Sequence, residues 1–216
     1  MPVISIDTKK KEMVGRFKNV GTTWESKPVL VNDHDFKRDA RGTAIPWGLY
    51  ETQANRGHLF LGTSHDTPAF PVTALARWWT RTGRQRYPQT QRLLILADCG
   101  GSNGPRTRAW KYELQTHFCN RFGLKVTLCH YPPGTSKWNP IEHRLFSQVS
   151  NLETYETILN FIRTTKTDTG LAVTATLIDG EYPTGVKVSE AQMADVHLCS
   201  HRVLPVWNYT LAESKR

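Results

Sequence analysis

The sequence lacks the features that mark membrane-spanning or disulfide-stabilised proteins. It has no apolar run long enough to cross a bilayer and no signal peptide at Met1, so we expect a soluble, cytoplasmic protein with no membrane partner. Cysteine is scarce, and no CxxC pair occurs. The spacing of Cys119, Cys129 and His130 fits no standard zinc site, so buried, reduced thiols are the favoured interpretation.

Acidic residues are also few, and their scarcity is local. The 216 residues include 28 Lys and Arg against 19 Asp and Glu, which gives a net charge of +9. Residues 70–144 hold twelve basic residues and only three acids, Asp98, Glu113 and Glu142. A basic field with a few isolated carboxylates is typical of enzymes that act on nucleic acid through metal ions. The alternative is a basic surface that serves only solubility.

The stretch LLILADCGGSNG, residues 93–104, contains the first of these acids. Four apolar residues, 93–96, predict a buried strand, and Asp98 follows at its carboxyl end before a glycine-rich loop. Open α/β sheets place their active sites at this position. The alternative is that Asp98 only begins a turn, as Asp commonly does.

The amino-terminal residues predict a strand that carries a second acid. Residues 3–7 alternate, so Ile4 and Ile6 share one face while Ser5 and Asp7 share the other. A second short strand over 13–18 would complete a hairpin. Asp7 is either an ordinary solvent-facing acid beside the lysine run 9–11 or a functional carboxylate.

The order of the remaining elements predicts an α/β fold with a mixed sheet. Strands are expected over 45–50, 57–63, 93–96 and 124–129, and the last two are each preceded by an amphipathic helix, over 72–79 and 110–122. A further helix over 155–162, an edge strand over 171–177 and a short helix capped by Ser189 complete the pattern.

The segment HYPPGTSKWNPIEHR, residues 130–144, contains the third acid. Two prolines and a glycine exclude regular structure at its start, and Asn139, Pro140 and Glu142 then occupy the N-cap, N1 and N3 positions of a helix. Glu142 either closes a capping box with the Asn139 amide or is held at the helix start as a metal ligand.

Taken together, ISIDTKKKE, ILADCGGSNG and HYPPGTSKWNPIEHR, followed by YPTGVKVS and WNYTL, resemble the Rhodopirellula-type DDE transposases of bacterial insertion sequences. The NPIE tetrapeptide is also similar to that of mariner-like transposases. The resemblance covers nearly the full chain. It implies an RNase H-like fold, a mixed five-stranded sheet flanked by helices, over residues 1–168, with a small C-terminal extension, 169–216, packed on it.

The resemblance further implies that Asp7, Asp98 and Glu142 form the acidic triad. Three carboxylates at two strand ends and a helix start can hold two Mg²⁺ or Mn²⁺ ions, which activate a water or a 3′-hydroxyl and stabilise the leaving oxygen. We expect cleavage at the transposon ends followed by strand transfer into target DNA. The residues expected to contact DNA, or in part to orient Glu142, are Lys9, Lys137, Asn139, His143 and Arg144.

The resemblance also predicts the binding partners of the protein. It implies binding to DNA at the nucleoid and assembly into homo-oligomers. Only six residues precede Asp7, where relatives carry a DNA-binding region, so we expect a truncated enzyme. The alternatives are a catalytically inactive, DNA-binding transposase remnant and an RNase H-like nuclease without strand transfer.

Overall fold

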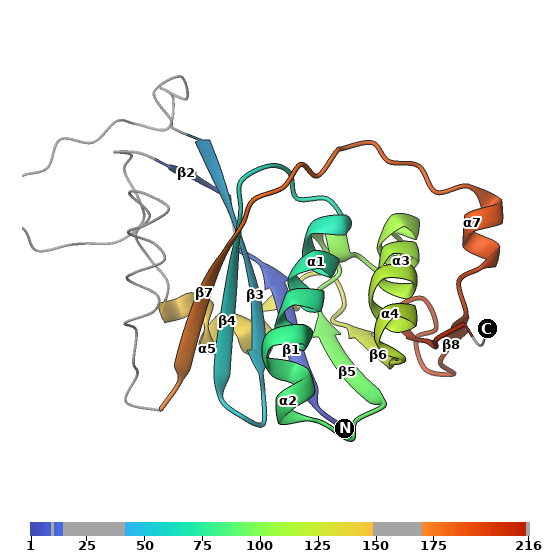
Figure 1. Ribbon diagram of the computed structural model, residues 1–216, viewed down its shortest axis with the longest axis horizontal. Helices are drawn as coiled ribbons and strands as arrows, with labels where there is room; N and C mark the ends of the chain where they lie inside the picture. Colours follow the sequence, from blue (N-terminus) through green and yellow to red (C-terminus); the bar gives the residue numbers. More distant parts are fainter. Residues whose placement is uncertain (10, 15–41, 149–169, 215–216) are drawn as a thin grey trace, which may run out of the picture.

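A computed structural model describes residues 1–9, 11–14, 42–148 and 170–214 (Figure 1). The sheet has the strand order β7-β4-β3-β1-β5-β6-β9-β8, and β2 also pairs with β3. The strands span β1 Val3–Thr8, β2 Glu12–Val14, β3 Gly42–Glu51, β4 Arg56–Gly62, β5 Arg92–Ala97, β6 Lys125–His130, β7 Ala172–Ile178, β8 Leu198–Ser200 and β9 Asn208–Leu211.

The sheet is mixed, as predicted. Strand β1 pairs antiparallel with β3 and parallel with β5, and β5 pairs parallel with β6. Strands β4, β3, β1, β5 and β6 form the central five strands, so the predicted α/β fold with a mixed sheet is confirmed. Strand β7 extends one edge, parallel to β4, and β9 and β8 extend the other.

The predicted hairpin between the first two strands is wrong. Strand β2 does not pair with β1. Both strands pair with β3 instead: Thr8 of β1 is opposite Trp47, and Glu12 of β2 is opposite Ala44, further along the same strand. The backbone N–H of Lys9 donates to the carbonyl of Pro46, which keeps the chain on the same partner strand. The connecting residues include no glycine, proline, asparagine or aspartate, the residues that favour a tight hairpin turn.

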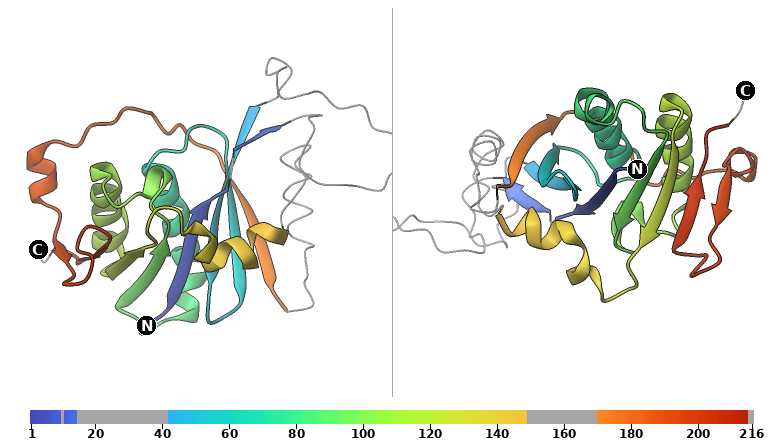
Figure 2. Two further views of the ribbon diagram at one scale, coloured as in Figure 1. Left: turned by 180° about the vertical axis from the view of Figure 1, so that it is seen from behind. Right: turned by 90° about the horizontal axis from the view of Figure 1, so that it is seen from below.

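Helices cover both faces of the sheet (Figure 2). One face carries two long helical segments, each interrupted by a π-helical turn: α1 Ala69–Trp78 continues into α2 Arg84–Arg86, and α3 Arg108–Leu114 continues into α4 Asn120–Phe122. The opposite face carries α5 Pro140–Arg144, which packs on β1 and β3. Helix α7 Glu190–Ala194 contacts α3, and its N-cap Ser189 forms the predicted cap.

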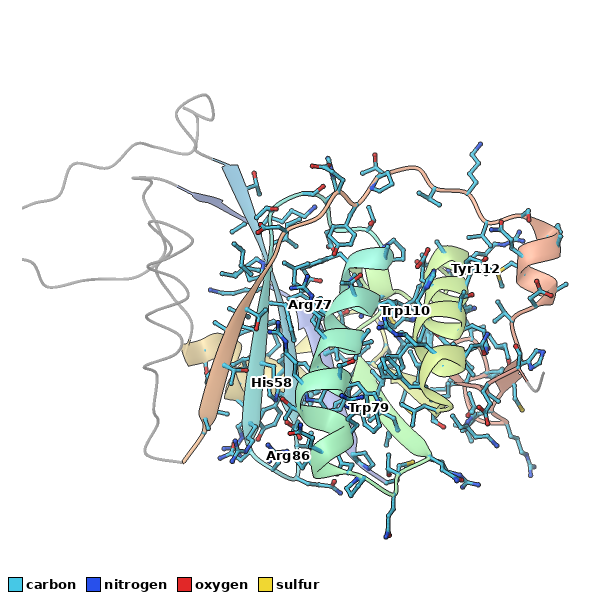
Figure 3. All side chains as sticks on the ribbon, viewed as in Figure 1. His58, Arg77, Trp79, Arg86, Trp110 and Tyr112 are labelled. Carbon is cyan, nitrogen blue, oxygen red and sulfur yellow. The ribbon has the colours of Figure 1, made fainter. Side chains whose placement is uncertain are left out.

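Each face has its own apolar core because the sheet is covered on both sides. The larger core lies under α1 and α3 and includes Trp79 and Trp110, which come from the two neighbouring helical segments (Figure 3). The smaller core includes Ile141 of α5 and Leu145, the residue that directly follows this helix. In β4 the side chains alternate, so Phe60 enters the larger core while Leu59 and Leu61 enter the smaller one.

The C-terminal residues contribute strands at both edges of this sheet. Strand β7 adds to β4, while β9 adds to β6 after the chain has crossed to the other side. The boundary at residue 168, and with it the division into a catalytic domain and an extension, stays a prediction. The helix expected over 155–162 lies outside the described residues. None of the described helices has the length and apolar character needed to cross a membrane.

Candidate active site

Asp7 lies near the end of β1, on the face that the alternation predicts. Ile4 and Ile6 are fully buried in the larger core, so Ser5 and Asp7 face α5 on the opposite side. The Asp7 side chain is 6% exposed, and its Oδ1 accepts a hydrogen bond from the backbone N–H of Thr8 at 2.7 Å. A carboxylate is therefore held at the sheet surface with little access to water.

Asp98 directly follows β5, the parallel neighbour of β1. The register pairs Ile6 with Ala97, so Asp7 and Asp98 are the next residues along two hydrogen-bonded strands. Neighbouring strands lie about 4.8 Å apart, and side chains at equivalent positions of parallel strands point to the same face. The strand register therefore brings these two acids together, although 90 residues of sequence separate them.

Glu142 reaches the same place because the start of α5 is attached to β1. The Asn139 side chain is fully buried; its Oδ1 accepts from the Ser5 hydroxyl, and its Nδ2 donates to the Ile6 carbonyl at 3.1 Å. The backbone N–H of Ile141 donates to Ser5 Oγ at 3.2 Å. Ser5 thus binds two residues at the helix start, two positions before Asp7 on the same face of β1.

The capping-box interpretation of Glu142 is contradicted. Asn139 is the N-cap residue, as predicted, but its side chain makes no cap hydrogen bond. The backbone N–H of Asn139 donates to the carbonyl of Ser136 at 2.8 Å, so it is not the partner of the Glu142 carboxylate. Glu142 instead interacts with Asp7.

The pKa values of Asp7 and Asp98 are both raised, by burial and by neighbouring carboxylates. Burial, the charge of Asp98 and a side-chain hydrogen bond to Glu142 raise the pKa of Asp7 to about 8. Burial is also the largest cause of the raised pKa of Asp98, and the charge of Glu142 adds to it. Mutual repulsion of this kind requires that the groups lie within several ångströms of one another.

Such a set of acids fits a divalent cation, and one atom supports this directly. Asp98 Oδ1 is buried and has no hydrogen-bond partner, which is costly for a carboxylate oxygen unless a cation binds it. All the ligands would be oxygens, which Mg²⁺ and Mn²⁺ prefer. In the described part of the chain, no three His, Cys, Asp or Glu side chains are gathered as closely as a bound metal ion requires.

His130 and Tyr209 support the backbone at Asp98, a role that no sequence pattern indicated. His130 Nδ1 lies 2.8 Å from the Asp98 carbonyl oxygen, and Nε2 lies 3.3 Å from the Tyr209 hydroxyl. Burial lowers the pKa of His130 to about 4, so the ring is neutral. The tautomer that fits donates from Nδ1 to Asp98 and accepts from Tyr209 at Nε2. Only strand pairing across β5, β6 and β9 brings these residues together.

The residues expected to contact DNA divide into two groups. Lys137, His143 and Arg144 are exposed around the start of α5, and Lys9 is partly exposed after β1. Asn139 is buried, and its side-chain amide donates to the Ile6 carbonyl of β1. Of its two predicted roles, contact with DNA and orientation of Glu142, the structure therefore favours the second. His143 Nε2 contacts the Lys137 carbonyl and holds the preceding turn against the helix.

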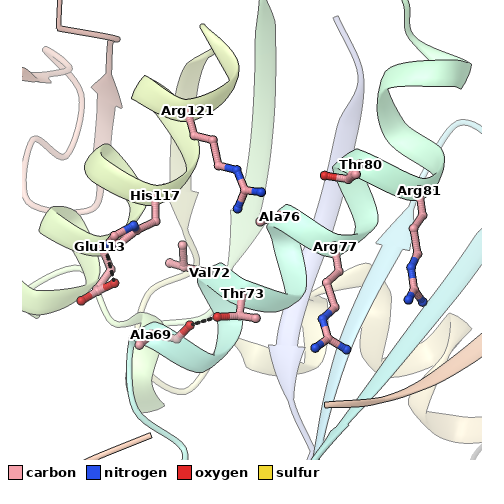
Figure 4. A pocket seen from close by; sticks show the side chains of 10 residues that line it. All are labelled: Ala69, Val72, Thr73, Ala76, Arg77, Thr80, Arg81, Glu113, His117 and Arg121. Carbon is pink, nitrogen blue, oxygen red and sulfur yellow. Dashed lines mark hydrogen bonds and ion pairs between the residues drawn. The ribbon is translucent and has the colours of Figure 1, made fainter. Parts of the chain in front are cut away.

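A separate basic groove lies between α1 and α3–α4 (Figure 4). These helices cover the face of the sheet opposite α5 (Figure 2). The groove has a volume of about 490 Å³. Arg121 reaches from α4 toward α1, while Arg77 extends from α1 and Arg81 extends from the π-helical turn that follows α1 (Figure 4). The acid in its lining, Glu113, lies 3.6 Å from His117. Three arginines, Arg77, Arg81 and Arg121, therefore line one groove.

The central five-stranded order, with an acid at the end of β1, another after β5 and a third on a helix across the sheet, defines an RNase H-like DDE domain. The sequence model of the Rhodopirellula transposase DDE domain matches residues 1–213. The chain therefore belongs to this transposase family, as the motifs indicated. No curated protein matches the sequence.

Proposed function

We propose that this chain cleaves phosphodiesters at transposon ends and transfers the freed 3′-OH strand into target DNA, with Asp7, Asp98 and Glu142 as the catalytic residues. Family membership supports a transposase function, and DDE transposases generally use divalent metal ions. The observation that carries the residue assignment is geometric: the parallel register of β1 and β5 sets Asp7 beside Asp98, and hydrogen bonds from Ser5 to Asn139 and from Ile141 to Ser5 bring the start of the Glu142 helix to β1.

In this proposal the three side chains hold two divalent ions through their carboxylate oxygens. Bound in this way, the ions would lower the pKa of the attacking water or 3′-hydroxyl and stabilise the leaving oxygen. Asp98 Oδ1, which has no protein partner, is the first candidate ligand atom. Ser5 and Asn139 fix the backbone that carries Glu142, and His130 fixes the backbone that carries Asp98. These three are positioning residues.

Exposed basic residues on the same side would bind the DNA strand. Lys137 and Arg144 flank α5, and Lys9 follows Asp7 in the sequence. Contacts to phosphates position a strand without reading its sequence, so these residues supply affinity and register. We further propose that the enzyme acts as a homo-oligomer on paired transposon ends, as its family resemblance implies.

A nicking assay tests the proposal. The purified chain is incubated with supercoiled plasmid carrying the element's terminal repeats, with Mg²⁺ or Mn²⁺ and with EDTA as the blank. We expect metal-dependent nicking that falls about 100-fold or more in Asp98→Asn, because loss of one preorganised electrostatic group costs about 10²–10³ in rate. A free 3′-OH oligonucleotide then reports strand transfer.

The control variant is Glu190→Gln, an acid of α7 whose side chain is 88% exposed and which lies outside both the candidate site and the helical groove. It should nick at the wild-type rate. If the wild-type chain binds the plasmid but never nicks it with either metal, the catalytic proposal fails and the inactive, DNA-binding remnant is the better description. Nicking without strand transfer would instead favour an RNase H-like nuclease.

A further inference from the structure

The turn before Glu142 exposes a tryptophan. Trp138 is 66% exposed, whereas Trp47, Trp78, Trp79 and Trp110 are at most 5% exposed. Tryptophan is rarely left in water at this level because its ring carries a large apolar area. An exposed indole beside a proposed catalytic acid therefore suggests that a ligand covers it.

The exposure of Trp138 is fixed by the hydrogen bonds of its turn. Its backbone N–H donates to the carbonyl of Thr135 at 2.9 Å, and the Thr135 hydroxyl donates to the Pro132 carbonyl at 2.6 Å. The next residue, Asn139, is fully buried and bonded to β1. The ring is thus presented from a turn that is anchored on both sides, and little conformational entropy would be lost when a ligand binds to it.

The neighbouring charge indicates the chemistry of the ligand. The Lys137 ammonium lies 5.4 Å from the centroid of the Trp138 ring, within the range of a cation–π contact. An apolar protein surface docking here would take this ammonium out of water without a partner. A nucleotide satisfies both groups, because its base stacks on an aromatic face while its phosphate pairs with the ammonium.

The short sequence separation between Trp138 and Glu142 limits the distance between the exposed ring and the proposed catalytic acid. Trp138 and Glu142 are four residues apart, so their Cα atoms are at most about 14 Å apart. A strand of B-form DNA advances about 3.4 Å per nucleotide. A base stacked on Trp138 therefore lies within about four nucleotides of a phosphate held at Glu142.

We propose that Trp138 and Lys137 form a nucleotide-binding site that stacks one unpaired base of the DNA strand beside the scissile phosphate. This proposal rests on the proposed function of the three acids. It deepens that function by adding a base-stacking contact, which requires that a base within about four nucleotides of the cleavage point leave the duplex. The site binds any base, because every base offers a π face.

Binding of two single strands by the full-length chain tests the site. One is a fluorescein-labelled dT12 oligonucleotide, and the other is a twelve-residue abasic strand with the same phosphates and no bases; fluorescence anisotropy gives both affinities at one salt concentration. We expect the wild type to prefer dT12 by roughly 5- to 150-fold, the range for one stacked base. Trp138→Ala should abolish this preference and leave abasic-strand affinity unchanged.

Two further variants complete the test. Trp138→Phe keeps an aromatic face and should retain most of the preference, while Val203→Ala, at an apolar residue that is 69% exposed, should retain all of it. If Trp138→Ala keeps the dT12 preference, or weakens both strands equally, the stacking site is refuted. Asp98→Asn separates the two proposals, since it should abolish nicking and preserve the preference. A wild-type chain that prefers dT12 through Trp138 but never nicks refutes only the catalytic proposal.

Discussion

Glu51→Gln should strongly destabilise the protein, although Glu51 is not part of the candidate active site: it lies on β3 opposite Ile4, whereas Asp7 is opposite Gly48. Glu51 ends β3 and is fully buried. Its carboxylate receives His58 Nε2 at 2.7 Å, the Tyr87 hydroxyl at 2.8 Å and Trp78 Nε1 at 3.4 Å, and Arg86 Nε lies at 3.3 Å. One carboxylate therefore fastens α1 and α2 to β3 and β4. His58 and Arg86 lie at the α2 end of this helical segment (Figure 3).

The magnitude follows from this burial. Glutamine keeps the shape of the side chain but loses the negative charge that compensates Arg86. Its NH2 group is a donor, so it cannot accept the hydrogen bonds that one carboxylate oxygen of Glu51 accepts. Removing one partner of a buried ion pair costs about 3–5 kcal/mol. A typical domain has about 5–15 kcal/mol of stability, so the variant should unfold at a much lower urea midpoint, with partial unfolding at 37 °C.

The pH dependence provides a second measure of the same network. Burial alone raises the pKa of Glu51, but hydrogen bonds from His58 and Tyr87 and the charges of His58 and Arg86 outweigh it and leave the pKa below its ordinary value of 4.5. A lowered folded-state pKa contributes stability that is present above pH 4.5 and is lost as the pH falls through the folded value. Urea melts between pH 3 and pH 7 should show this acid loss for the wild type and less of it for Glu51→Gln.

Glu190→Gln is the matched control. Glu190 pairs with Arg108 at 2.5 Å, but its side chain is 88% exposed, so water replaces the lost contact and the midpoint should stay near that of the wild type. If Glu51→Gln unfolds at the same urea concentration as Glu190→Gln, the buried network contributes no net stability. The reasoning from burial would then be refuted.

Three further predictions concern the candidate site and the groove. Asn139→Ala should cost about 2–4 kcal/mol, because it removes the acceptor of the buried Ser5 hydroxyl and the donor to the Ile6 carbonyl, and should slow nicking more than an equally destabilising variant elsewhere. Gly48→Ala should lower both stability and nicking, because its Cβ would lie 2.6 Å from a Phe146 ring carbon and push away the segment that carries α5; an unchanged thermal midpoint would contradict this close packing. Arg81→Glu with Arg121→Glu should reduce the salt dependence of duplex binding by about two phosphate contacts and leave nicking of a short oligonucleotide intact; an unchanged slope would mean that the groove does not bind DNA.

Much of the fold could be predicted because its signals are local. The apolar run 93–96 gave β5, and Trp110, Leu114 and Phe118 at four-residue spacing gave the helix that ends at Gly123. Gly123 adopts a φ of 64°, the left-handed conformation that favours glycine at a helix end. The hairpin prediction failed because two adjacent strands of the sequence can share one partner, and strand pairing is not a local property.

Sequence patterns determined which acids to consider and where each sits on its own element: Asp7 opposite the isoleucine face, Asp98 after a buried strand, and Glu142 at a helix start. Tertiary structure alone decided their relationship. The parallel register of β1 and β5 sets Asp7 beside Asp98, and the Ser5–Asn139 hydrogen bond draws the Glu142 helix onto the same strand. Periodicity reports the face on which a side chain lies. Register and packing form between segments that are distant in sequence, so no local pattern encodes which faces meet.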